Sequence, residues 1–266
     1  MSTDAALDHA LALARPALSA PPAGLLTDLD GTLAPIVRDP AAVRLADGAA
    51  GALEVLAARL AVVGVVTGRA ATDARRILGT PALLVIGNHG LEWLGPGAAE
   101  ADVAPDVQRA AAALDGVIAS VPNEPGVIVE HKGLSATVHY RNAPDPDTAR
   151  VRVLAALEVA PRAGIDVRHG RMSVELRPAG LGDKGSALRD VVDRYALRGL
   201  LVMGDDVTDL DMFRAAANLR ASGRLRAAIV GVAGEREVPA EVAAAADTTM
   251  PDVAALVRLL EHLGKG

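Results

Sequence analysis

Two carboxylates stand two residues apart at the end of a short apolar stretch, Asp28 and Asp30, and are followed by Gly31 and Thr32. In an extended chain, side chains two residues apart point to the same side, so both carboxylates face one space where the strand ends. Gly31 lets the backbone turn sharply beyond them. Two like charges this close are unfavourable unless a cation lies between them or one carboxyl keeps its proton. Hydrolysis of a phosphate ester through a covalent intermediate uses both arrangements, with one Asp as nucleophile beside a metal and the other as general acid and base.

Two further residues could complete such chemistry. Phosphoryl transfer needs a nucleophile, a group that neutralises the charged phosphate oxygens, and a proton donor for the leaving oxygen. Asp28 can attack phosphorus, while Thr67 donates a hydrogen bond and Lys184 brings a positive charge. Each also has an ordinary interpretation, because Asp-Gly is a common turn, Thr before Gly can cap a helix, and lysine usually faces solvent. Since each residue stands at a predicted strand end or helix start, we favour the catalytic interpretation of the set.

A second acidic segment holds Asp205, Asp206 and Asp209 after an apolar run. Together with Asp28 and Asp30, Asp205 would form an oxygen-rich site, which suits Mg²⁺, a hard cation that takes carboxylate, phosphate and water ligands. A cluster of acids with one lysine is a poor site for zinc. The alternative is a turn with a helix cap, in which Asp209 is an ordinary surface acid.

Alternating strands and helices would position these residues. Apolar runs of strand length alternate with amphipathic segments of helical period. This order is typical of an α/β fold with a right-handed, doubly wound parallel sheet, in which ligands gather at the carboxyl ends of the strands. Asp28, Thr67 and Asp205 all follow such strands. We expect strands over 61–66, 82–86, 200–203 and 227–232, the last in the chain, and helices over 46–60, 70–78, 184–195 and 252–263.

The pattern changes in the middle of the chain. Residues 134–141 alternate between apolar and polar side chains, which is typical of a strand with one covered face. We therefore expect a smaller α/β domain inserted over residues 106–178, with the doubly wound core formed by 1–105 and 179–266. The elements of the insertion would be helices over 105–121 and 147–160 and strands over 126–132, 134–141, 165–168 and 172–176.

Composition excludes several classes of function. The 266 residues are 51% hydrophobic and 23% charged, as in a globular protein, and the net charge of −6 argues against a nucleic-acid partner. Without cysteine the chain has no disulfide, thiolate zinc site or thiol nucleophile. The N-terminal segment lacks the basic start of a signal peptide, and apolar stretches are interrupted before membrane-spanning length, so we expect a cytoplasmic protein with no membrane partner. Aromatic residues are scarce, so polar groups would have to hold a sugar or base.

These segments resemble those of a known family. In order along the chain, four of them resemble the motifs of the haloacid dehalogenase superfamily: Asp28-Leu-Asp-Gly-Thr32, Thr67-Gly-Arg69, Lys184 and Gly204-Asp-Asp-Val-Thr-Asp209. Within it, four others resemble the trehalose-6-phosphate phosphatases: Leu33-Ala-Pro-Ile36, Gly87-Asn-His-Gly-Leu-Glu92, Glu130-His-Lys-Gly133 and Gly170-Arg-Met-Ser-Val-Glu175. The resemblance covers nearly the whole chain apart from its first residues and its tail. It implies a haloacid-dehalogenase-like core with an α/β cap domain that selects the substrate.

The resemblance implies a role for each acidic residue. Asp28 would be the nucleophile, forming an aspartyl-phosphate intermediate, and a Mg²⁺ ligand. Asp30 would be the acid and base, and its backbone carbonyl would lie on the metal. Asp205 would be the second carboxylate ligand, supported by Asp206 and Asp209. The cofactor would be Mg²⁺, and the substrate would be trehalose 6-phosphate, hydrolysed to trehalose and phosphate.

The resemblance also implies a sugar site built from polar residues. Six residues are expected there: Arg69, Asn88 and His89 from the core, and Glu130, Lys132 and Glu175 from strands of the cap. Asn88 and His89 could equally hold a turn together. Arg141 and Arg177 are further candidates, although arginine at a strand end usually meets solvent.

Other functions stay open at this point. Related phosphatases that act on sucrose phosphate or mannosyl-3-phosphoglycerate share the core motifs, so only the cap residues could separate them. A signalling receiver domain also uses an acceptor Asp, an acidic pair, Thr and Lys, but in a much shorter chain and without an acid like Asp30 two residues after the acceptor. We also expect a functional link to a trehalose-6-phosphate synthase, although the sequence does not show whether the two proteins associate.

Overall fold

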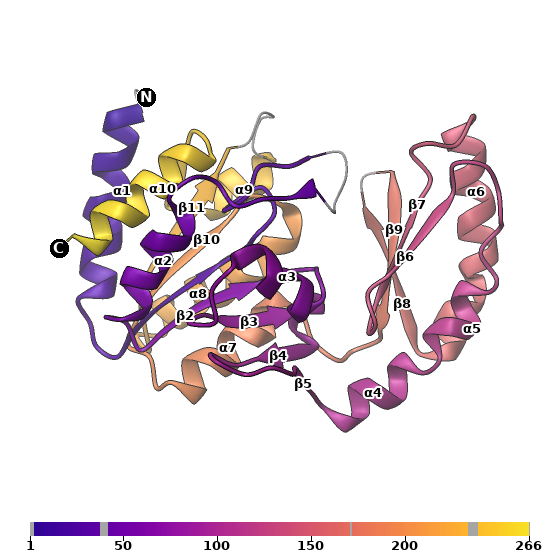
Figure 1. Ribbon diagram of the computed structural model, residues 1–266, viewed down its shortest axis with the longest axis horizontal. Helices are drawn as coiled ribbons and strands as arrows, with labels where there is room; N and C mark the ends of the chain where they lie inside the picture. Colours follow the sequence, from indigo (N-terminus) through magenta and orange to yellow (C-terminus); the bar gives the residue numbers. More distant parts are fainter. Residues whose placement is uncertain (1–2, 38–41, 171, 234–238, 266) are drawn as a thin grey trace. The chain divides into compact units, whose positions relative to one another are not determined.

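The computed structural model describes residues 3–37, 42–170, 172–233 and 239–265 (Figure 1). Arg171, in one of the segments that carry the family resemblance, lies outside these residues. The chain divides into two compact units: a core unit, Met1–Ala101 with Gly182–Gly266, and an insert unit, Asp102–Leu181. The domain boundaries predicted from the sequence fall after residues 105 and 178.

The larger sheet has eight strands in the order β12-β11-β10-β1-β2-β3-β4-β5, of which all but β5 belong to the core unit. Its strands are β1 Ala23–Thr27, β2 Val62–Val66, β3 Leu84–Gly87, β4 Glu92–Leu94, β5 Asp102–Val103, β10 Gly199–Gly204, β11 Arg226–Val232 and β12 Thr248–Met250. From β12 to β3 all neighbours are parallel, and β4 runs antiparallel to β3. Strands β1, β2, β3 and β10 are buried along their whole length, because helices cover both faces of the sheet.

The helices of the core unit form two layers (Figure 1). On one face of the sheet α1, α2, α3 and α10 share an apolar cluster, and on the other face α7, α8 and α9 share a second one. Their bounds are α1 Thr3–Leu18, α2 Ala49–Ala57, α3 Ala71–Leu78, α7 Lys184–Arg194, α8 Leu210–Ala221, α9 Ala240–Ala245 and α10 Val253–Gly264. Among the described residues, no helix is long and apolar enough to span a membrane.

The strand order changes direction at β1. The chain passes outward through β2 and β3 on one side and returns to β10 on the other, so β1 lies between β2 and β10. In doubly wound sheets this point opens a crevice at the carboxyl ends of the strands, where ligands bind. Asp28 directly follows β1, and Asp205 directly follows β10. The topology therefore brings the two acidic segments together.

The insert unit is a four-stranded antiparallel sheet with helices on one face. The strand order is β6-β7-β9-β8, and α5, α6 and the 3₁₀ segment η3 bury their apolar side chains against it. The elements are α4 Pro105–Ala111, α5 Leu114–Ile118, β6 Ile128–His131, β7 Ala136–His139, α6 Pro146–Ala156, η3 Leu157–Ala163, β8 Ile165–Gly170 and β9 Ser173–Pro178. Valines of neighbouring strands, Val138 and Val174, face the helices. Their polar neighbours in sequence therefore occupy the opposite face of the sheet.

Several elements differ from the sequence-based prediction, and β4, β5 and α9 were not predicted at all. The single helix predicted over 105–121 is two short helices, α4 and α5. The helix predicted over 147–160 ends at Ala156 and continues as the 3₁₀ segment η3, in which Pro161 has no N–H to offer a helical hydrogen bond. The prediction that 227–232 is the last strand is wrong, because β12 follows and pairs with β11. Its three residues are too few for a recognisable strand pattern.

Candidate active site

Asp28 lies at the carboxyl end of β1, beside the end of β10. The parallel register pairs Thr27 with Met203, and the Asp28 backbone N–H donates to the Met203 carbonyl at 3.0 Å. Asp28 is only 6% exposed. The sheet therefore fixes the backbone of Asp28 and brings its carboxylate close to Asp205, two residues beyond Met203.

Lys184 reaches the same place from the start of α7. Asp183 caps this helix by accepting from the Ser186 backbone N–H at 2.7 Å, and Ser186 Oγ accepts from the Asp183 N–H at 2.8 Å. The buried Lys184 ammonium donates to Asp28 Oδ1 at 2.6 Å and to Asp209 Oδ1 at 2.7 Å. Burial alone would lower the pKa of Lys184, but the charges of Asp209 and Asp28 raise it above its usual range. The lysine is therefore charged and lies between two carboxylates.

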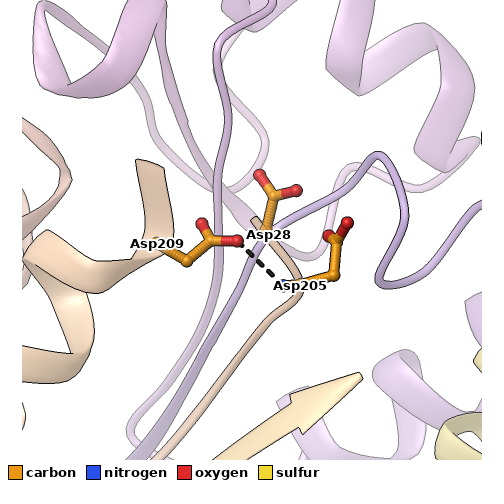
Figure 2. Close-up of side chains that lie close together, drawn as sticks. All are labelled: Asp28, Asp205 and Asp209. Atoms are coloured by element: carbon orange, nitrogen blue, oxygen red, sulfur yellow. Dashed lines mark hydrogen bonds between the residues drawn. The ribbon is translucent and has the colours of Figure 1, made fainter. Parts of the chain in front are cut away.

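The carboxylates of Asp28, Asp205 and Asp209 lie close together (Figure 2). One oxygen each of Asp28, Asp205 and Asp209 lie within 4.8 Å of one another. Asp209 is fully buried, and its Oδ2 accepts from the backbone N–H groups of Asp205 and Asp206 at 2.9 and 3.1 Å. Thr32 Oγ1 donates to Asp205 Oδ1 at 2.8 Å. Asp209 therefore holds the loop in place, which leaves Asp28 and Asp205 as the carboxylates best placed to bind a ligand.

Gly31 permits the close approach of the two acidic loops. Its φ of +90° lies in the left-handed region that favours glycine. A Cβ atom at this position would lie only 2.1 Å from Asp205 Oδ2. Any side chain at position 31 would therefore push Asp205 out of its place beside Asp28.

Burial and mutual repulsion raise the pKa values of the cluster. Burial raises the pKa of Asp28 well above its usual range; the charge of Lys184 opposes this, and Asp209, Asp205 and Asp30 add to it. Burial likewise raises the pKa of Asp205 to about 7, with a further contribution from Asp209. Full ionisation of the cluster is thus unfavourable without a cation. An all-oxygen donor set with uncompensated negative charge fits a hard divalent cation such as Mg²⁺.

The Asp30 carboxylate is not part of this cluster and pairs with Arg69 instead. Arg69 Nε and Nη2 donate to the two oxygens of Asp30 at 2.7 and 2.9 Å, and Arg69 Nη1 donates to Asp73 at 2.9 Å. The side chain of Asp30 is 35% exposed and that of Arg69 is 13% exposed. Because a bidentate pair fixes the direction of a carboxylate, the predicted acid-base residue is held in a defined position.

Thr67, Asn88 and His89 are buried at the ends of neighbouring strands. The His89 N–H donates to the Thr67 carbonyl and the Asn88 N–H donates to the Arg69 carbonyl, both at 2.8 Å. Asn88 and His89 adopt left-handed φ values of +48° and +59°. The Asn88 side chain also donates to Glu92 Oε1 at 2.6 Å. In these contacts Asn88 and His89 hold a turn, which is one of the two roles expected of them.

Two of the expected sugar residues share one face of the insert sheet. Glu130 on β6 lies opposite Thr137 on β7, and Thr137 lies opposite Glu175 on β9. His139 Nε2 is 3.0 Å from Glu130 Oε2. Arg177 pairs with Glu175 and is 4% exposed, so it does not meet solvent as a strand-end arginine usually does. This face therefore presents paired charges rather than isolated ones.

Lys132 and Arg141 lie at the ends of the same hairpin. The Lys132 N–H donates to the Ser135 carbonyl at 2.8 Å, and Gly133 turns the chain with a φ of +82°. Lys132 is partly exposed, and Arg141, beyond the end of β7, is exposed. Lys132 follows Glu130 by two residues but lies in the turn beyond β6, which ends at His131.

The family is decided by comparison with known proteins. A family model described as trehalose-phosphatase matches residues 26–246. The chain belongs to the trehalose-phosphatase family. Trehalose-phosphate phosphatases from Mycobacterium marinum and Mycobacterium tuberculosis are each 39% identical to it, over 224 and 220 residues. The matches cover 78% and 77% of this chain but 55% and 54% of those proteins, so the chain spans about half the length of these curated relatives.

Solved structures of other proteins share the fold. The C-terminal domain of C. albicans trehalose-6-phosphate phosphatase is 22% identical, with a TM-score of 0.73, over 100% of this chain and 97% of that one. A trehalose-6-phosphate phosphatase related protein is 24% identical, with a TM-score of 0.72, over 91% and 97%. A haloacid dehalogenase-like hydrolase from Bacteroides thetaiotaomicron is 14% identical, with a TM-score of 0.64, over 90% and 98%. The family and the doubly wound α/β fold predicted from the sequence are confirmed.

Three residues of this trehalose-phosphatase family member contact predicted site residues without having been predicted themselves. Asp73 forms an ion pair with Arg69, which lies four residues earlier in the sequence. Such a spacing near the start of a helix could have indicated the pair. Glu92 bonds Asn88 and lies in a segment that carries the family resemblance. His139 contacts a predicted sugar residue across a hairpin, and no local sequence signal marks such a pair.

Proposed function

We propose that this protein hydrolyses trehalose 6-phosphate to trehalose and phosphate as a Mg²⁺-dependent phosphomonoesterase. The observation that carries the proposal is the buried contact of Lys184 with Asp28 beside Asp205, in a chain of the trehalose-phosphatase family. A carboxylate nucleophile with a fixed positive charge beside it, and with further acids able to hold a metal, meets the needs of phosphoryl transfer.

In the first step Asp28 attacks the phosphorus atom, and the bond from phosphorus to the sugar oxygen breaks. Lys184 through its ammonium group and Thr67 through its hydroxyl stabilise negative charge on the phosphate oxygens. Asp30, in its protonated form, donates a proton to the leaving oxygen, so that trehalose leaves as a neutral alcohol. The phosphoryl group stays on Asp28 as an aspartyl phosphate.

In the second step water attacks the phosphorus atom of the aspartyl phosphate. Asp30, now ionised, takes a proton from this water, and the bond between phosphorus and Asp28 breaks. Phosphate leaves, and both carboxylates return to their starting states. Asp30 has to act from nearly the same place in both steps, which its bidentate pair with Arg69 supports.

Mg²⁺ would be held by the carboxylates of Asp28 and Asp205 and by the Asp30 backbone carbonyl, with Asp206 and Asp209 in support. When bound, it supplies positive charge that offsets these carboxylates and the phosphate oxygens. The raised pKa values of Asp28 and Asp205 support the need for such a charge.

Selection of the sugar is assigned to the insert unit, acting as a cap domain. Trehalose is uncharged and rich in hydroxyls, and charged groups can accept from or donate to several hydroxyls at once. Glu130 and Glu175 supply such groups on one face of the insert sheet, and Lys132 supplies another from the turn after β6. Three residues of the core, Arg69, Asn88 and His89, would contribute to sugar binding as well. Because trehalose 6-phosphate has to be made by a synthase, we place this protein after such a synthase, in the cytoplasm.

A substrate panel tests the proposal. Phosphate release should be fastest from trehalose 6-phosphate, with much lower kcat/KM for sucrose 6-phosphate and glucose 6-phosphate, in the presence of Mg²⁺. A preference for sucrose phosphate or for mannosyl-3-phosphoglycerate would contradict the proposed substrate but not the phosphatase reaction. A stable phosphorylated protein with no turnover on any sugar phosphate would instead favour a signalling receiver.

A further inference from the structure

Glu92 is a buried carboxylate that the proposed mechanism does not use. It begins β4 and is 8% exposed. One of its oxygens, Oε1, accepts two hydrogen bonds, from the backbone N–H of Ala71 at 2.7 Å and from Asn88 Nδ2 at 2.6 Å. A buried carboxylate is costly unless such donors satisfy it. The pair of short bonds therefore ties Glu92 firmly to two other segments.

The two segments are the loops that follow β2 and β3. Ala71 is the first residue of α3, at the end of the loop that carries Thr67 and Arg69. Asn88 fastens this loop a second time, because its backbone N–H donates to the Arg69 carbonyl at 2.8 Å. Gly87 leaves the room for this packing, since a Cβ there would lie 2.4 Å from the Ala71 nitrogen and 2.7 Å from Glu92 Oε1. Glu92 thus holds the loop after β2 directly and through Asn88.

The same loop carries Arg69, whose side chain binds the carboxylate of Asp30. Arg69 donates to both carboxylate oxygens of Asp30, at 2.7 and 2.9 Å. A shift of the Arg69 backbone therefore moves or releases the Asp30 carboxylate. We propose that Glu92 is a positioning residue which, by fixing the loop of residues 67–71, sets the place of Arg69 and through it that of Asp30. This inference rests on the proposed function, because it concerns Asp30 as acid and base.

The two steps of the reaction depend differently on Asp30. With p-nitrophenyl phosphate the leaving group departs as a stable phenolate, so transfer of the phosphoryl group to Asp28 needs little help from an acid. Hydrolysis of the aspartyl phosphate still needs Asp30 to take a proton from the attacking water. A misplaced Asp30 should therefore slow the second step selectively, and phosphorylated enzyme should accumulate.

Rapid-mixing kinetics with p-nitrophenyl phosphate and Mg²⁺ test this. Glu92→Ala should release p-nitrophenolate in a burst of about one equivalent, followed by a steady rate lower than in wild type by on the order of 10²-fold, the cost of a small misplacement of a catalytic group. Glu92→Gln should recover most of the steady rate, because an amide oxygen can accept both hydrogen bonds. The matched control is Glu100→Ala, which removes an exposed acid a few residues away and should behave as wild type.

Thermal unfolding of each variant sets a working temperature at which all are folded. If Glu92→Ala does not fold, Glu92→Asp replaces it, since the shorter carboxylate cannot reach both donors. Burst and steady phases lowered in equal proportion would mean that Glu92 only stabilises the fold, and the inference would fail. A Glu92→Gln variant as slow as Glu92→Ala would also overturn it. No phosphate release by wild type from any substrate would refute the proposed function itself.

Discussion

Replacing Asp205 by Asn should make the metal-free protein more stable at neutral and alkaline pH. The pKa of Asp205 is raised from 3.8 to about 7 in the folded protein, first by burial and then by the charge of Asp209. At pH values below about 3 this carboxyl is protonated in both states and has no effect. Between 3.8 and about 7 the unfolded chain loses the proton more readily, so stability falls as the pH rises. Above about pH 7 the carboxylate is ionised in both states, and the folded protein stays destabilised by the full amount.

The size of the effect follows from the shift. A rise of the Asp205 pKa from 3.8 to about 7 corresponds to about 1.4 kcal/mol per pH unit. It lowers the free energy of unfolding by about 4 kcal/mol at pH 8 and by about 1.5 kcal/mol at pH 5. Asn keeps an oxygen to accept the 2.8 Å hydrogen bond of Thr32 but cannot ionise. The free energy of unfolding of Asp205→Asn should therefore exceed that of wild type by up to these amounts. The raised pKa of Lys184 adds no slope here, because lysine is charged in both states over this range.

Urea unfolding in EDTA at pH 5 and pH 8 measures the difference. Asp8→Asn, which removes an exposed acid of α1, is the matched control and should leave the pH dependence unchanged. Added Mg²⁺ should stabilise wild type more than Asp205→Asn, since the variant lacks a carboxylate ligand. Equal stability of wild type and Asp205→Asn at both pH values would refute the claim that ionisation of Asp205 destabilises the metal-free folded protein. So would a wild type whose stability rises with pH more steeply than that of the variant.

Further predictions concern the metal, the buried lysine and the sugar. EDTA should abolish phosphate release and Mg²⁺ restore it, whereas Ca²⁺ should support it poorly because of its larger and looser ligand shell; full activity after exhaustive chelation would contradict the metal assignment. Lys184→Met should lower the free energy of unfolding by about 3–5 kcal/mol, because Asp28 and Asp209 would lose their shared counter-charge; a loss below about 1 kcal/mol would contradict this. Glu130→Ala or Glu175→Ala should lower kcat/KM for trehalose 6-phosphate by about ten- to more than a hundredfold. The same variants should leave kcat/KM for p-nitrophenyl phosphate nearly unchanged. Equal losses on both substrates would contradict their role at the sugar.

The meeting of Asp28 with Asp205 could be predicted because it depends on topology alone. Each acid directly follows a buried strand, and parallel strands bring their carboxyl ends to one edge of the sheet. Lys184 could be placed there for a related reason, since the sequence predicts that it begins a helix of the doubly wound core. Backbone direction and residue type were sufficient in these cases.

Side-chain pairs between loops could not be predicted in the same way. The Asp30 carboxylate bonds Arg69 rather than joining the acidic cluster, and this depends on side-chain rotamers at two strand ends. The burial of Glu92 could not be predicted from the sequence, because acidic residues are seldom buried and one of its two partners, the Ala71 backbone N–H, lies in another loop. Strand β12 has too few residues for a pattern, and its place is set by pairing with β11.

The central claim is that Asp28 carries the phosphoryl group, and mass spectrometry of acid-quenched enzyme tests it most directly. Wild type mixed with trehalose 6-phosphate and Mg²⁺, then quenched during turnover, should yield a peptide containing Asp28 that is heavier by one phosphoryl group. Asp28→Asn, with its fold verified by its unfolding transition, should show neither this peptide nor phosphate release. A phosphoryl group found on another residue, or turnover near the wild-type rate in folded Asp28→Asn, would contradict the mechanism.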